Sequence, residues 1–188
     1  MMASGAPHCP PAASTERVVP VRFYNQSRLS ENSLQAIVQI ANRVWAPYRI
    51  VIEMSGKGDG INIVVSGDDA SAPTGDGGAP TVIGTTMFSN GHATPNIHLS
   101  VGAAEQLVNW SADKREPLSA RPVAVLDAIV PRVLGVALAH ELAHYLLDTS
   151  GHSREGLLRG RLSLSEMENP QSSRLRLSCA QRQALFGQ

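Results

Sequence analysis

The chain has 188 residues, of which 43% are hydrophobic, so it has the size of one domain with a substantial core. Sixteen basic and sixteen acidic residues give a formal net charge of zero, and no local run supplies the basic patch that nucleic acid binding requires. No apolar run reaches the length of about 18 residues that a membrane helix needs, so neither nucleic acid nor a membrane span is expected.

The N-terminal residues 1–17 are predicted to form a flexible tail, and 18–188 a single domain. The first part of the tail is rich in Pro, Ala and Ser, with neither the basic nor the apolar stretch of a signal peptide. Cys9 and Cys179 are the only two cysteines. They could form one disulfide in an oxidising compartment or be two unrelated thiols, and the sequence leaves both open.

The first half of the domain is predicted to alternate strands with one helix. A strand is expected over 18–24, where Pro20 indicates a strand start or a sheet edge. A helix is expected over 31–45, because a helix-start cluster precedes apolar residues at helical spacing and a proline follows. Alternating apolar residues predict a strand over 48–54, and a glycine-rich turn then separates it from a third strand over 61–65.

Residues 66–80 contain almost no apolar side chains and are predicted to form an exposed loop. The aspartates of this loop could bind calcium, although their spacing matches no calcium-binding template. A solvated loop is therefore the preferred interpretation. The aspartates concerned are Asp68, Asp69 and Asp76.

Two further strands are expected over 81–88 and 96–101, with a loop joining them. Residues 122–147 are predicted to form either one helix kinked at Pro131 or two helices in succession, since proline interrupts a helix whose apolar character continues on both sides. A short C-terminal helix through Leu185 is expected, with Ser178 as its N-cap.

The pattern H-E-x-x-H lies near the end of the long helical region, at His140, Glu141 and His144. Residues four apart on a helix share one face, so the two histidines can direct ring nitrogens at one metal ion. Glu141 is offset by about 100° around the axis, which suits a general base outside the ligand set. Catalytic zinc takes three protein ligands and lowers the pKa of a water to about 7, so the pattern predicts a hydrolytic zinc site.

The helix around this pattern is apolar on nearly every face, so it is expected to run through the interior. An unpaired, ionised Glu141 in such a helix would cost on the order of several kcal/mol, for which a zinc ion and its water would compensate. An ordinary core helix with two satisfied histidines would leave the carboxylate unexplained.

His152 is the expected third ligand. The helix is predicted to stop before Gly151, which can adopt a left-handed conformation, and a chain reversal there could return the imidazole of His152 to the metal. The alternative is a carboxylate from a later helix, either Glu166 or Glu168. Glu155 is a weaker candidate.

These residues resemble the signature of the metzincin metallopeptidases, H-E-x-x-H-x-x-G-x-x-H, in which three histidines bind zinc and the glutamate is the general base. His140, Glu141 and His144 match directly. His152 lies eight residues after His144 instead of six, and Leu147 stands where the signature has glycine. A two-residue insertion in the turn accounts for both differences.

Residues 151–159 are similar to the corresponding stretch of matrixin-like proteins from bacteria, which leads into a methionine-containing turn below the metal. Leu158 stands where that methionine is expected, and Met167 is the other candidate. The resemblance implies a metzincin-like α+β fold, with a twisted mixed sheet of four to five strands packed on two long helices. It also implies an upper subdomain over 18–151, a small C-terminal subdomain over 152–188, and a secreted or periplasmic location.

The pattern and the element order together predict a zinc-dependent endopeptidase, a hydrolase that cleaves peptide bonds with a metal-activated water. One catalytic zinc ion is expected on His140, His144 and His152, with Glu141 as general base. Two alternatives stay open. One is a gluzincin-type zinc peptidase with the carboxylate ligand named above, and the other is a noncatalytic zinc-containing module that binds peptides.

The expected partner is a protein or peptide substrate, lying extended in a cleft and paired through its main chain with a sheet-edge strand. Residues 83–87 are the candidate strand, with Gly84 and Thr85 as candidate substrate-binding residues. A monomer is the favoured oligomeric state.

Overall fold

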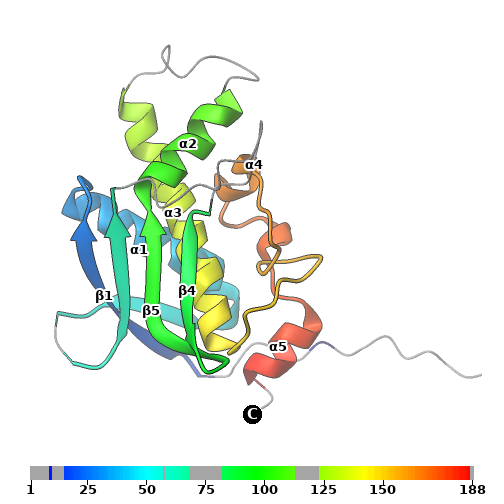
Figure 1. Cartoon of the computed structure of the whole chain (residues 1–188). Coiled ribbons are helices and arrows are strands. Elements are labelled where there is room, and N and C mark those ends of the chain that lie inside the picture. The colour runs from blue at the N-terminus through cyan, green and yellow to red at the C-terminus, as the bar shows by residue number, and fades with distance from the viewer. Residues whose placement is uncertain (1–8, 10–14, 57, 68–81, 113–122, 187–188) are drawn as a thin grey trace, which may run out of the picture.

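The computed structural model describes residue 9 and the ranges 15–56, 58–67, 82–112 and 123–186 (Figure 1). Most of the predicted N-terminal tail and the aspartates Asp68, Asp69 and Asp76 of the possible calcium loop lie outside these residues. Within them, no helix is both long and apolar enough to cross a membrane. The helices and strands are β1 (Arg17–Gln26), α1 (Glu31–Trp45), η1 (Ala46–Tyr48), β2 (Ile50–Met54), β3 (Ile61–Ser66), β4 (Gly84–Ser89), β5 (His92–Ser100), α2 (Val101–Ala112), α3 (Val123–Leu146), α4 (Leu164–Met167), η3 (Ser173–Leu175) and α5 (Cys179–Phe186).

The described strands form one mixed sheet of five, in the order β2-β1-β3-β5-β4. The first four strands in this order run parallel, and β4 pairs antiparallel with β5 and so forms a free edge. The long helices α1 and α3 cover one face of the sheet (Figure 1). This arrangement confirms the predicted α+β class, with a mixed sheet packed on two long helices.

Helix α1 has the boundaries that the sequence predicts. Ser30 caps its N-terminus, since the side-chain oxygen of Ser30 accepts a hydrogen bond from the backbone N–H of Ser33 at 3.2 Å. Its apolar stripe is buried against the sheet and α3. At the crossing of the two helices, a Cβ added to Gly135 would stand 2.5 Å from Cβ of Ile40. Glycine is therefore required there for the close approach of α1 and α3.

Helix α3 is continuous from Val123 to Leu146 with Pro131 inside it, which decides between the two arrangements left open by the sequence. Its central residues are buried, as expected for a helix that is apolar on every side. The indole Nε1 of Trp45 on α1 donates a hydrogen bond to the carbonyl oxygen of Ala139 at 3.2 Å. The packing of α3 holds the histidine-bearing turns at a fixed position under the sheet.

The prediction of a loop between the last two strands is wrong, because a tight turn joins β4 and β5 into a hairpin. Its turn is Asn90-Gly91, with φ values of 52° and 84°, a pair of left-handed residues that suits the twist of a two-residue hairpin. Within β5, Pro95 is tolerated because β5 pairs with β3 only from Asn96 onward, so Pro95 takes no part in that ladder.

Cys9 and Cys179 form a disulfide, which decides the second question that the sequence left open. The bond joins the N-terminal segment to the first residue of α5, across a sequence separation of 170 residues. The backbone N–H of Arg182 donates to the carbonyl oxygen of Ser178 at 2.9 Å, so α5 begins where the sequence predicts.

Candidate metal centre

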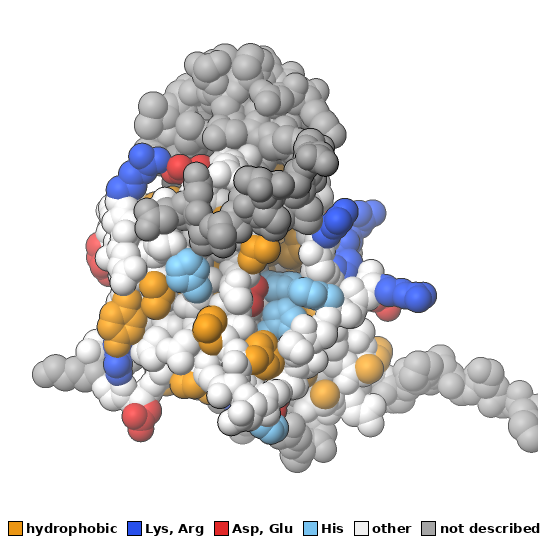
Figure 2. Space-filling view, in the orientation of Figure 1, with side chains coloured by type: hydrophobic (Ala, Val, Ile, Leu, Met, Phe, Trp, Pro, Cys, Tyr) orange, Lys and Arg blue, Asp and Glu red, His pale blue; other side chains and the backbone are white. Residues whose placement is uncertain are grey.

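Three histidines meet at the end of α3. His140 and His144 lie on its last turns, and His152 comes from the segment that follows the helix. Their possible ligand atoms all lie within 4.8 Å of one another. His140 and His144 are buried, and His152 is exposed. Figure 2 shows histidine side chains gathered in a hollow on the face of the molecule that carries the free edge of the sheet.

The turn that brings His152 back has its left-handed residue at Asp148, with a φ of 46°, and not at Gly151 as expected. The reason lies in the contacts of the Asp148 side chain. One carboxylate oxygen accepts a hydrogen bond from the backbone N–H of Ala93 at 2.7 Å, and the other lies 2.6 Å from Nδ1 of His92. The hairpin of β4 and β5 is thereby joined to the turn that follows α3, the helix that carries His140 and His144.

Two main-chain carbonyls orient the rings of the helical histidines. Nδ1 of His140 lies 2.7 Å from the oxygen of Leu157, and Nδ1 of His144 lies 2.6 Å from the oxygen of Thr149. A carbonyl oxygen only accepts, so both Nδ1 atoms carry the proton, and a neutral ring then has its lone pair on Nε2. Such partners are typical of histidines that bind metal through the other nitrogen.

The two Nε2 atoms face each other at 3.1 Å. Lone pairs at this distance repel unless a proton or a cation lies near both. Burial is the main cause that lowers the pKa of His140 to about 4, so this ring supplies no such proton at neutral pH. Two nitrogens bound to tetrahedral zinc at about 2.0–2.1 Å are separated by roughly 3.3 Å. The pair therefore fits a zinc ion.

His152 completes a three-histidine set. Its ring centroid lies 5.4 Å from that of His140 and 5.0 Å from that of His144. A Cβ at Gly160 would lie 3.4 Å from Cγ of His152, so the ring rests against the backbone of residue 160. Burial, followed by the neighbouring His144, lowers the pKa of His152, which favours the neutral form that binds metal.

The structure does not bring the alternative carboxylate ligands into this group. Among the described residues, neither Glu166 nor Glu168 nor Glu155 joins the three histidines. Glu166 instead accepts hydrogen bonds from the backbone and hydroxyl of Ser163 and pairs with Arg159 at 2.9 Å. Burial would raise the pKa of Glu166, but these contacts outweigh it and lower the pKa to about 2. The Glu166 carboxylate is therefore bound by Ser163 and Arg159, away from the three histidines.

Glu141 is buried, with 6% of its surface exposed. The hydroxyl of Thr86 lies 2.8 Å from Oε2 of Glu141 and 2.8 Å from its backbone oxygen. Burial raises the pKa of the Glu141 carboxyl, while the hydrogen bond from Thr86 and the proximity of His144 act in the opposite direction. The contact between Thr86 and Glu141 was not predicted from the sequence, because 55 residues separate the two partners.

The strand predicted to bind substrate is the free edge of the sheet. The backbone N–H of Ser100 donates to the oxygen of Ile83 at 2.9 Å, so Ile83 faces β5. Two residues after Ile83 in the same strand, Thr85 lies opposite His98 of β5. Because backbone groups alternate along a strand, those of Gly84 and Thr86 face the free edge, and those of Thr85 face β5. The side chain of Thr85 is exposed.

Two buried residues are candidates for the turn below the metal, Leu158 with 1% and Met167 with 5% of their surfaces exposed. Leu158 accepts a hydrogen bond from the backbone N–H of Ser153 at 2.8 Å. It is thereby tied to the residue that directly follows His152. Leu157, next to it, provides the carbonyl that orients His140.

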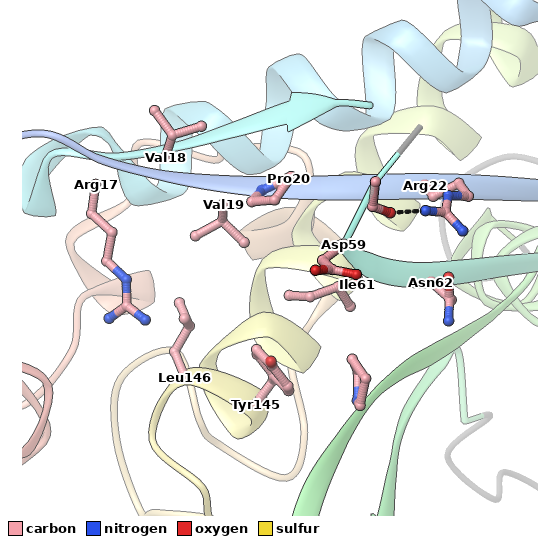
Figure 3. Close-up of a pocket in the computed structure, with 13 residues that line it drawn as sticks. Arg17, Val18, Val19, Pro20, Arg22, Asp59, Ile61, Asn62, Tyr145 and Leu146 are labelled. Atoms are coloured by element: carbon pink, nitrogen blue, oxygen red, sulfur yellow. Dashed lines mark hydrogen bonds between the residues drawn. The ribbon is translucent and has the colours of Figure 1, made fainter. Parts of the chain in front are cut away.

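A separate pocket of about 600 Å³ lies where β1 extends beyond the start of β3 (Figure 3). Tyr145 and Leu146, at the end of α3, form part of its wall, and none of the three clustered histidines lines it. Because none of those histidines contributes to its wall, the pocket is distinct from the histidine site. It is also lined by Pro20 and Pro95, which have no backbone N–H with which an added strand could pair.

A scan of the sequence against protein-family models gives no match, and a search of curated proteins gives none either. Among solved structures, archaemetzincin from Methanopyrus kandleri is similar in fold, with a TM-score of 0.53 and 13% sequence identity. The likeness covers 92% of this chain and 97% of that one. At this identity it concerns the fold alone, and it shows that the chain has a metzincin-like α+β fold.

Proposed function

We propose that this protein is a zinc-dependent endopeptidase. The observation that supports this most strongly is the pair of Nε2 atoms of His140 and His144, 3.1 Å apart, with the carboxylate of Glu141 on the same helix turn. Two ring nitrogens at this distance can bind one metal ion, and a buried carboxylate beside a metal ion is the arrangement of a hydrolytic metal site. The archaemetzincin likeness supports the proposal at the level of fold.

His140, His144 and His152 would hold the zinc ion. When bound, zinc would supply a Lewis acid able to activate a water molecule and polarise the scissile carbonyl. Glu141 would accept the proton from the water and pass it to the leaving amine. The carbonyls of Leu157 and Thr149 would keep the rings of His140 and His144 in the metal-binding tautomer.

The substrate would be an extended peptide that adds a strand to β4. The backbone groups of Gly84 and Thr86 face the free edge, where they can form hydrogen bonds with such a peptide. The exposed side chain of Thr85 would lie beside a substrate side chain. The cleft would then run between an upper subdomain over 18–151 and a lower one over 152–188.

Within the metzincin fold we favour the matrixin-like branch, on the sequence of residues 151–159, although Leu158 departs from the pattern of that branch, which has methionine at this position. The Cys9–Cys179 disulfide supports a secreted or periplasmic location, because structural disulfides persist in oxidising compartments.

The proposal is tested by removing metal with a chelator and titrating zinc back while a fluorogenic peptide is hydrolysed. We expect hydrolysis to appear in proportion to zinc and to level off at one equivalent per chain. His152→Ala should reduce zinc affinity sharply, since it removes one of three ligands. Hydrolysis that persists without metal, or a His152→Ala variant that retains full zinc affinity, would contradict the proposal.

A further inference from the structure

The side chain of Glu141 is held from the side of β4. Thr86 is 6% exposed, and its hydroxyl lies 2.8 Å from both Oε2 and the backbone oxygen of Glu141. A hydroxyl has one proton to donate. The backbone oxygen faces the N–H of Tyr145, four residues further along α3, whereas a buried carboxylate oxygen needs an outside donor. The Thr86 hydroxyl therefore donates its hydrogen bond to Oε2 of Glu141.

Gly84 provides the room that this arrangement needs. A Cβ at this position would stand 2.8 Å from Cγ and 3.0 Å from Oε1 of Glu141, closer than such atoms approach each other. Gly84 and Thr86 are two residues apart in β4, so they present the same face of the strand to α3. Oε2 thus accepts a hydrogen bond from the hydroxyl of Thr86, and Oε1 lies next to Gly84.

We propose that Thr86 is a positioning residue for the general base, an inference that rests on the proposed function. Its hydroxyl fixes Oε2 of Glu141, and the absence of a side chain at Gly84 leaves the space that Oε1 occupies. Oε1 then takes the proton when an O–H bond of the attacking water breaks, and this proton later goes to the leaving amine nitrogen.

Strand β4, which carries Thr86, would also bind the substrate, so the contact between Thr86 and Glu141 links the general base to the bound peptide. The backbone groups of Thr86 face the free edge, whereas its side chain reaches Glu141. The bound peptide and the general base are therefore fixed relative to each other through one residue. A hydroxyl at residue 86 should matter for the chemical step more than for substrate affinity.

The test compares Thr86→Val, which keeps the shape but loses the hydroxyl, with Thr86→Ser, which keeps the hydroxyl. For Thr86→Val we expect kcat to fall by about 10- to 100-fold, with KM within about twofold and an unchanged zinc content. Thr86→Ser should keep kcat within about threefold. Thr94→Val is the matched control, since the hydroxyl of Thr94 donates to the oxygen of Met87 at 3.0 Å in the same hairpin, and its kcat should be unchanged.

Crystal structures of the zinc-loaded variants give a readout that does not depend on activity. The Glu141 carboxylate should occupy one position in the wild type and in Thr86→Ser, and a shifted or divided position in Thr86→Val. An unchanged kcat in Thr86→Val, an equal loss in Thr86→Ser, or an unmoved carboxylate would each overturn the inference.

If Thr86→Val does not fold, Gly84→Ala takes its place, because the added Cβ displaces Glu141 while the hydroxyl remains. An unaltered kcat in Gly84→Ala would then overturn the inference. If the wild type binds zinc but hydrolyses no peptide, the proposed function fails. The position of the carboxylate still decides whether Thr86 fixes it.

Discussion

Replacing Glu166 with Gln tests both the stability of the C-terminal segment and the identity of the third ligand. The Glu166 side chain is 9% exposed and accepts hydrogen bonds from Ser163, while Arg159 pairs with it at 2.9 Å. The substitution keeps the shape but removes the charge on which these contacts depend. It should therefore weaken the link between α4 and the segment after His152.

The magnitude follows from the pKa of Glu166, which lies at about 2 instead of its ordinary 4.5. A pKa difference of about 2.5 corresponds to about 3 kcal/mol, and solvent screening near the surface reduces this to about 1–2 kcal/mol. Because the folded-state pKa of Glu166 is depressed, its contribution is complete above pH 4.5 and is lost as the pH falls toward 2.

Urea unfolding of the zinc-free wild type and of Glu166→Gln measures this contribution. At pH 7 the variant should be less stable by about 1–2 kcal/mol, and near pH 2.5 the difference should be much smaller. In a separate measurement on zinc-loaded protein, Glu166→Gln should bind one equivalent of zinc, as the wild type does. Equal stabilities at pH 7 would refute the account of the Glu166 contacts, and loss of zinc would indicate that Glu166 is a ligand.

Two further predictions concern the packing of α3 and the turn after it. Gly135→Ala places a Cβ 2.5 Å from that of Ile40, and overpacking should lower the free energy of unfolding by about 1–3 kcal/mol despite the better helix propensity of alanine, as thermal unfolding would show. Asp148→Ala removes the acceptor of the Ala93 N–H and frees the turn whose Thr149 carbonyl orients His144, so zinc affinity in a chelator competition should fall by about 10-fold or more. An unchanged melting temperature in the first variant, or an unchanged zinc affinity in the second, would count against these assignments.

The sequence predicts best those elements that local patterns define. The helix over 31–45 follows from a cap, an apolar stripe and a terminating proline, all within one short stretch. His140, Glu141 and His144 follow from helical spacing alone, since four residues make about one turn. The dipeptide Asn90-Gly91 is also a local signal, typical of a two-residue hairpin turn, yet the prediction placed a longer loop there and missed the first residues of β5.

The parts that the sequence did not reveal depend on contacts between distant segments. The carbonyl oxygen of Leu157 meets His140 only because the C-terminal segment folds back onto α3. Thr86 reaches Glu141 only because β4 is the strand next to that helix turn. The left-handed residue is Asp148 and not Gly151, because the hairpin supplies the partners that hold the aspartate. No local pattern contains this information.

The most direct measurement of the central claim is peptide hydrolysis by Glu141→Gln carrying the same amount of zinc as the wild type. Glutamine keeps the size of the side chain and cannot accept the proton from water, so kcat should fall by about 100-fold or more while one equivalent of zinc remains bound. A Glu141→Gln variant that retains the activity of the wild type at equal zinc content would contradict the assignment of this protein as a zinc peptidase with Glu141 as its general base.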